Sequence, residues 1–151
     1  MRLPTEFLTP TDFEAFARRI VSIILGKEII GFGEGKDDGI DGLDDINSPT
    51  IVVQAKRYQS RTPLNSFKKI VKREIDKIRN TAKKYEWNNN YEYVIVTSMD
   101  LNPLARKEIR DYAGSLIPSD KNIIDGVLLQ DLADKQKFHE TFVLYNLKEK
   151  N

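Results

Sequence analysis

One stretch, TIVVQAKRY at residues 50–58, decides the fold. Its β-branched start predicts a strand. Successive side chains of a strand point to opposite faces, so we expect Gln54 and Lys56 on the same face. Upstream, GIDG at residues 39–42 predicts a shorter strand that is interrupted by glycines. If the two strands pair through the Asn-Ser-Pro turn at 47–49, the Asp41 carboxylate meets the Gln54 amide and the Lys56 ammonium.

The flanking sequence predicts an α/β fold. A capping box at Thr11–Glu14 predicts the start of a first helix that ends near Leu25. Apolar spacing predicts further helices over 63–85 and 103–113, and two weaker helical segments close the chain. The expected strands are 28–32, 39–43, 50–58, 91–97 and 122–129, of which 91–97 is apolar enough to be central. The predicted order is αβββαβαβα, a sandwich with a central mixed sheet of about five strands flanked by helices.

Composition excludes several classes of protein. The 151 residues fit a single domain over 1–151. The absence of cysteine excludes disulfide scaffolds, Cys-ligated metal sites and thiol nucleophiles. No apolar run reaches 18 residues and the first residues lack a secretory signal, so we expect a cytoplasmic protein without a membrane partner.

The charge is unevenly distributed along the chain. Residues 51–90 carry 11 basic and 3 acidic side chains, a net charge of +8, whereas the remaining residues carry −7. A basic block beside an acidic one suits a protein that binds a polyanion and holds cations, although a solvated helix face gives the same pattern. The residues that we expect to bind nucleic acid are Arg57, Tyr58, Arg61, Lys68, Lys69, Lys72 and Arg73.

The three polar groups on the two strands suit metal-assisted hydrolysis of a phosphodiester. Mg²⁺ prefers oxygen ligands and takes few carboxylates from a protein. Asp41 offers an anionic oxygen, Gln54 a neutral oxygen, and the backbone carbonyl of Ala55 a third. Lys56 can lower the pKa of an attacking water, orient that water, or stabilise charge on the phosphate.

These same motifs resemble the active-site signature of the PD-(D/E)XK nuclease superfamily, and most of all its Mrr-type restriction endonuclease branch. Ile40 stands in place of the proline that names the superfamily, and Gln54 in place of its acidic residue, as in that branch. The resemblance extends more loosely from Phe13-Glu14 to the late strand at Ile124–Gly126. It implies a restriction-endonuclease-like sandwich, Mg²⁺ or Mn²⁺ as cofactor, DNA as substrate, and a catalytic centre of Asp41, Gln54, Lys56 and Glu14.

The resemblance further implies a metal-dependent endodeoxyribonuclease in restriction or anti-phage defence. Such a domain serves as the effector of a larger protein, with a fused or partner sensor or NTPase domain. A homodimer or higher oligomer suits a double-strand break, because one site cuts one strand at a time.

Other interpretations remain open from the residues alone. The pair Gln54 and Lys56 can be an ordinary polar strand edge. Glu14 can be the partner of Thr11 in the capping box rather than a catalytic residue. The whole domain can be a catalytically inactive nucleic-acid-binding module with the nuclease fold, or a protein-interaction or sensor domain that docks through the basic helix.

Overall fold

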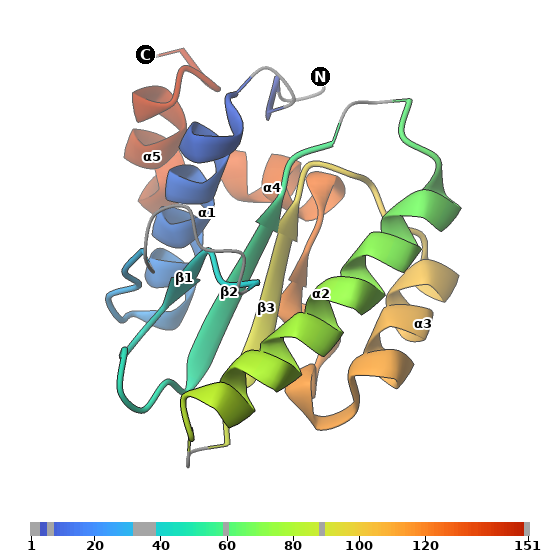
Figure 1. The fold of residues 1–151 in the computed structure, drawn as a ribbon. Helices are drawn as coiled ribbons and strands as arrows, with labels where there is room; N and C mark the ends of the chain where they lie inside the picture. The colour runs from blue at the N-terminus through green and yellow to red at the C-terminus, as the bar shows by residue number, and fades with distance from the viewer. Residues whose placement is uncertain (1–3, 6–7, 32–38, 59–60, 88–89, 150–151) are drawn as a thin grey trace.

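A computed structural model describes residues 4–5, 8–31, 39–58, 61–87 and 90–149 of the chain. Its strands are interspersed with helices along the sequence, in the order αββαβαβαα (Figure 1). They are α1 (Pro10–Leu25), β1 (Gly42–Leu43), β2 (Ile51–Lys56), α2 (Leu64–Lys84), β3 (Glu92–Thr97), α3 (Pro103–Ala113), β4 (Ile123–Ile124), α4 (Gly126–Ala133) and α5 (His139–Leu144). Short 3-10 turns occupy Gly114–Leu116, Asp120–Asn122 and Gln136–Phe138.

The sheet is mixed, as predicted, and its order is β1-β2-β3-β4. β1 runs antiparallel to β2, with Gly42 opposite Val53. β2 runs parallel to β3 over its whole length, and β3 runs parallel to β4. The apolar β3 therefore lies inside the sheet, which confirms its predicted central position.

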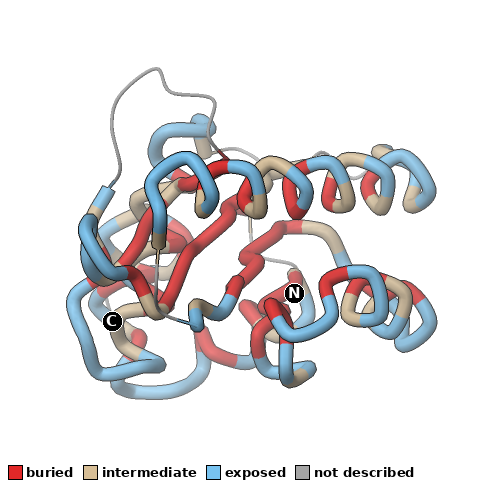
Figure 2. Tube along the Cα trace, turned by 60° about the horizontal axis from the view of Figure 1, so that its bottom comes forward, coloured by how far each residue is buried: buried red, intermediate tan, exposed pale blue. Residues whose placement is uncertain are grey.

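Two layers of helices cover the two faces of this sheet (Figure 1). On one face, α1, α4 and α5 pack against Val53 and Ala55 of β2. On the other face, α2 and α3 pack against Val52 of β2 and against Tyr93 and Ile95 of β3. Figure 2 shows the buried residues concentrated along the strands and on the helix sides that face them. Both faces of the central strands are buried, as in sheets with helices on either side.

The start of α1 differs from its prediction. Thr9, not Thr11, caps the helix: its hydroxyl oxygen accepts a hydrogen bond from the Asp12 N–H at 3.1 Å. Pro10 occupies the first turn, where its missing N–H costs nothing. The predicted capping box at 11–14 is therefore wrong by two residues, and Glu14 lies in the second turn, where no cap needs it.

The number of strands also differs from about five, because the described residues form four. Of the predicted strand 28–32, Ile30 makes an isolated antiparallel bridge with Leu43, and Phe32 lies outside the described residues. The predicted strand 122–129 pairs with β3 only at Ile123–Ile124. It ends there because Asp125 caps α4 by accepting the Leu128 N–H at 3.0 Å.

The strongest periodic patterns are confirmed. α2 runs from Leu64 to Lys84 and buries Phe67, Val71, Ile75 and Ile78, the apolar stripe expected on its inner side. α3 begins at Pro103, where Asn102 caps it through the Ala105 N–H at 2.8 Å. None of the described helices is both long and apolar enough to span a membrane.

Candidate active site

Asp41 is held beside β2 by backbone and side-chain hydrogen bonds. Its N–H donates to the Val53 carbonyl, and its Oδ2 accepts from the Ala55 N–H, each at 2.8 Å. Arg18 of α1 donates to the Asp41 carbonyl from Nη1, also at 2.8 Å. The two halves of the sequence motif, GIDG and QAK, are thus joined directly, as the pairing of the two strands predicted.

The glycines on either side of Asp41 allow this close packing. Gly39 has φ of 76°, a conformation that favours glycine, and a Cβ there would lie 3.3 Å from Lys77 Cβ of α2. A Cβ on Gly42 would lie 2.9 Å from Cγ of Arg18. The absence of a side chain at both positions therefore allows the segment to pack closely between α1 and α2.

Gln54 and Lys56 face the α2 side of the sheet, as strand alternation predicted. Gln54 is only 3% exposed, and its Oε1 accepts a hydrogen bond from the Tyr93 hydroxyl at 3.0 Å. The Lys56 ammonium lies 3.4 Å from Oε1 of Glu74, a residue of α2. Because Gln54 is almost fully buried, the pair does not form an ordinary exposed polar strand edge.

The electrostatics of Asp41 reflect the groups around it. The pKa of this carboxyl is raised from 3.8 to about 6, mainly by burial. The negative charges of Glu14 and Glu74 contribute to the rise, while the Ala55 hydrogen bond and the Lys56 ammonium oppose it. These four side chains therefore share one electrostatic neighbourhood, and a carboxyl with a raised pKa in such a setting is typical of functional sites.

Glu14 belongs to this neighbourhood through α1. It is half-buried one turn before Arg18, the residue that bonds to the Asp41 backbone. Because Thr9 caps the helix, the alternative capping role of Glu14 is excluded. The resemblance had implied this position for Glu14, and the electrostatic coupling to Asp41 agrees with it.

The oxygen atoms of Asp41, Gln54 and the Ala55 backbone are suitable ligands for a hard cation such as Mg²⁺ or Mn²⁺. The Val53 carbonyl points toward β1, whereas the Lys56 carbonyl accepts from Ser98 beyond β3. Backbone groups alternate along a strand, so the Ala55 carbonyl points to the β1 side, next to the Asp41 carboxylate. Oε1 of Gln54 keeps a second lone pair beside the Tyr93 bond. Within the described ranges, no group of three or more His, Cys, Asp or Glu side chains forms a metal cluster, so backbone and amide oxygens would have to complete the set.

The predicted nucleic-acid-binding residues fall into two groups. Lys68 and Lys72 lie on the α3 side of α2, where both pair with Glu108 at 3.1 and 2.8 Å. The other residues lie at or beyond the end of β2 or on the outer surface of α2. Arg61, Lys69 and Arg73 are exposed, whereas Arg57 and Tyr58 are partly buried.

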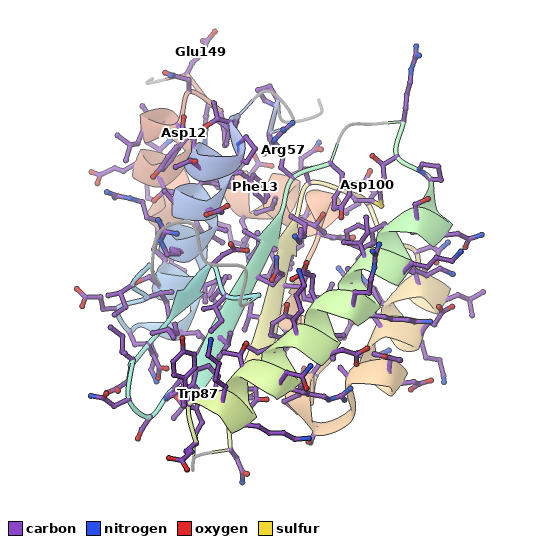
Figure 3. All side chains as sticks on the ribbon, viewed as in Figure 1. Asp12, Phe13, Arg57, Trp87, Asp100 and Glu149 are labelled. Atoms are coloured by element: carbon purple, nitrogen blue, oxygen red, sulfur yellow. The ribbon has the colours of Figure 1, made fainter. Side chains whose placement is uncertain are left out.

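The carboxyl end of β2 is fixed to β3. Ser98 accepts the Tyr58 N–H at 2.7 Å and donates to the Tyr58 carbonyl at 2.9 Å. The Tyr58 ring packs edge-on against Phe67, and burial together with the charge of Glu74 raises its pKa to about 12. In Figure 3, Arg57 and Asp100 lie at this end of the sheet and Trp87 lies at the opposite end.

Sequence reasoning missed two residues of the site, Glu74 and Tyr93. Glu74 is an acid on the apolar stripe of a mostly basic helix, between Val71 and Ile75, and that position was the available signal. Tyr93 carried no such signal, because an aromatic residue in a buried strand is ordinary core. Only the register of β2 and β3 places its hydroxyl next to Gln54.

Comparison with known families decides the assignment. The Mrr_cat model, described as restriction endonuclease, matches residues 6–135, which include every group of the site described above. The chain belongs to the Mrr-type restriction endonuclease family. The resemblance drawn from GIDG and QAK is confirmed, and so is the restriction-endonuclease-like α/β fold.

One curated relative is similar over most of this restriction endonuclease domain. It is an uncharacterized protein, y4cD, of Sinorhizobium fredii, 29% identical over 144 residues. The match covers 93% of this chain but 21% of the relative, so the chain spans about a fifth of that protein's length. No solved structure matches the chain significantly.

Proposed function

We propose that the protein is a metal-dependent endodeoxyribonuclease that hydrolyses DNA phosphodiester bonds at Asp41, Gln54 and Lys56, with Glu14 beside them. The observation that carries the proposal is the 2.8 Å hydrogen bond from the Ala55 N–H to Asp41 Oδ2, which brings the motif's acid to the strand that holds its amide and amine. Membership of a restriction endonuclease family supports the reaction class.

Asp41, Gln54 and the Ala55 carbonyl would hold Mg²⁺ or Mn²⁺. When bound, such an ion polarises the phosphoryl oxygen and makes water nucleophilic near neutral pH. The fixed Asp41 backbone orients its carboxylate, and the Tyr93 hydroxyl orients the Gln54 amide. Lys56 places a positive charge near the same point, where it stabilises the negative charge that builds on the phosphate.

Duplex binding would use the cations that surround this centre. Arg73 and Lys69 on α2 and Arg61 before α2 are exposed and can reach phosphates. Such contacts give affinity with little sequence preference and with strong salt dependence. Lys68 and Lys72 would contribute less, because Glu108 neutralises part of their charge.

The proposal is tested by plasmid nicking with Mg²⁺, with Mn²⁺ and with EDTA. We expect cleavage by the wild type, none in EDTA, and none by Asp41→Asn. The matched control is Asp45→Asn, an exposed acid of the same segment whose Oδ1 accepts hydrogen bonds from the Asn47 and Ser48 N–H groups. Equal cleavage by wild type and Asp41→Asn would remove the proposal.

A second candidate function is a catalytically inactive DNA-binding module. The observation in its favour is Gln54, which is neutral and almost fully buried, and so is a weaker metal ligand than a carboxylate. This candidate predicts salt-dependent binding to DNA with no cleavage under any divalent cation. Fluorescence anisotropy with labelled duplex, run beside the nicking assay, separates the two.

The biological setting that we propose is restriction or anti-phage defence. The relative, of which the match covers only 21%, supports a domain that acts within a larger protein. We further propose that a fused or partner sensor or NTPase domain supplies control. A homodimer or higher oligomer would allow both strands to be cut. Sedimentation with and without duplex DNA tests the oligomeric state.

A further inference from the structure

Glu74 is an unusual residue in its helix. It lies in α2, whose other charges are mostly basic, yet it faces inward and is only 7% exposed. A buried carboxylate is costly unless it is paired. Glu74 lies 3.4 Å from the Lys56 ammonium and 3.5 Å from the Lys77 ammonium, both measured from Oε1.

The carboxylate of Glu74 lies against the catalytic motif. A Cβ on Gly39, two residues before Asp41, would lie 3.4 Å from Oε2 of Glu74. The negative charge of Glu74 also raises the pKa of Asp41 and of Tyr93, the residue that bonds to Gln54. Glu74 therefore faces the centre from α2, on the side opposite to α1.

Lys56 needs such a partner. Its side chain is 28% exposed, so packing alone does not fix its ammonium. A lysine carries its charge on a flexible four-carbon stem. The neighbouring side chain on the same face of the strand is the amide of Gln54, which has no charge to attract an ammonium.

We propose that Glu74 is the positioning residue of Lys56: through the ion pair from α2 it holds the Lys56 ammonium beside Asp41 and Gln54, which the strand itself cannot do. Glu74 acts on Lys56 and not on the substrate. Lys77 is its second cation and balances the buried charge. The expected effect on kcat rests on the proposed nuclease function, whereas the ordering of the Lys56 ammonium by Glu74 does not.

The kinetic test compares Glu74→Gln with Asp76→Asn. The control removes an acid two residues away on the same helix, where Asp76 faces Tyr112 and Arg79 instead of the site. We expect Glu74→Gln to lower kcat about 10- to 100-fold with KM for DNA changed less than about twofold, as for partners that orient reactive groups. Asp76→Asn should keep wild-type kcat. Loss through KM alone, or equal loss in both variants, overturns the proposal.

An activity-independent test follows the Lys56 ammonium itself. ¹⁵N relaxation of lysine side-chain ammonium groups reports how rigidly each is held. In the wild type Lys56 should be more ordered than the exposed Lys83, and in Glu74→Gln the two should become alike. Unchanged order of Lys56 in Glu74→Gln overturns the proposal, whatever happens to cleavage.

The two proposals fail in distinguishable ways. If the wild type does not cleave, the nuclease function fails, and the ammonium order still decides whether Glu74 holds Lys56. If the wild type cleaves and Glu74→Gln matches it, only the positioning role fails.

Thermal unfolding checks that Glu74→Gln is folded. If it is not, Glu74→Asp keeps the charge one methylene shorter, and it should give intermediate kcat and intermediate Lys56 order; wild-type values of both would overturn the proposal.

Discussion

The tripeptide Ile-Asp-Gly occurs twice in this chain, at 40–42 and 124–126, and the two copies have opposite surroundings. Asp125 is 2% exposed and fully engaged in holding the fold. Its Oδ2 accepts the Leu101 N–H at 2.9 Å, its Oδ1 accepts the Leu128 N–H, and Arg106 pairs with it at 3.0 Å. This acid caps α4 and fastens that helix to the loop after β3.

Asp41 lies close to two other carboxylates as well as to the Lys56 ammonium. Its Oδ2 accepts the Ala55 N–H, while burial and the charges of Glu14 and Glu74 disfavour its ionisation. A cation would relieve this repulsion, whereas Asp125 already has a guanidinium group. The comparison teaches that an acid's role follows from the donors around it and not from its neighbours in sequence.

The largest effect that separates the two acids is on cleavage. Asp41→Asn should lower the nicking rate more than about 100-fold, since even residues that only orient metal ligands cost 10- to 100-fold. The variant should remain folded, because Asn can still accept the Ala55 N–H. Measuring nicking rates under saturating Mg²⁺ checks this. A nicking rate of Asp41→Asn within about tenfold of the wild-type rate would contradict a catalytic role for Asp41.

Asp125→Ala should act on stability instead. It removes the cap of α4 and leaves Arg106 without one of its buried partners, so the free energy of unfolding should fall by about 3–5 kcal/mol. Urea denaturation measures the change. Asp131→Asn, an exposed acid of the same helix, is the control and should stay within about 0.5 kcal/mol of wild type. A loss below about 1 kcal/mol in Asp125→Ala would contradict a structural role.

The glycines that follow Asp41 and Asp125 should also differ, one in its effect on cleavage and the other in its effect on stability. A Cβ on Gly126 would collide with Oδ1 of Asp100 and lie 2.6 Å from the Ser98 carbonyl oxygen, so Gly126→Ala should destabilise by about 2–3 kcal/mol. A Cβ on Gly42 would meet the flexible stem of Arg18, which can move, and Cγ2 of Ile29 at 3.0 Å, but no backbone atom. Gly42→Ala should therefore cost less stability but lower cleavage, because Arg18 holds the Asp41 carbonyl. Thermal unfolding and nicking assays of both variants test whether Gly126→Ala loses more stability and Gly42→Ala loses more cleavage.

The smallest expected effect is the pH dependence of Asp41. The folded protein retains this proton up to about pH 6, while the unfolded chain loses it near pH 3.8. The folded state therefore binds more protons in that window, and its stability falls as pH rises through it. In EDTA at pH 7.5, Asp41→Asn should be more stable than the wild type; the rise of the Asp41 pKa from 3.8 to about 6 limits the gain to about 3 kcal/mol, and the partial exposure of Asp41 reduces it. The difference should shrink as pH falls and level off near pH 3. A difference that is the same at pH 3 and pH 7.5 would contradict the raised pKa.

The sequence was sufficient to predict the structure where a hydrophobic pattern was long or where a motif contained chemically specific residues. The stripe of α2, the apolar β3 and the Asn102-Pro103 start of α3 were all correct, because periodicity and capping act locally. The contact of Asp41 with β2 followed from two strands joined by a turn.

Most of the incorrect predictions involve contacts between distant segments, and one involves a local choice between two capping residues. Asp125 looked like part of a strand in sequence, but it pairs with Arg106 and caps a helix. Thr9 was overlooked as the cap because Thr11 fits the same pattern two residues later. Glu74 and Tyr93 join the site only because α2 folds back over β2 and β3, which no local pattern reveals.

The most direct measurement is the anomalous difference density of a crystal soaked in Mn²⁺. The account predicts one ion bound to Asp41, to Oε1 of Gln54 and to the Ala55 carbonyl oxygen, and no ion at Asp125. An ion held elsewhere, or none at Asp41 at millimolar Mn²⁺, would contradict it.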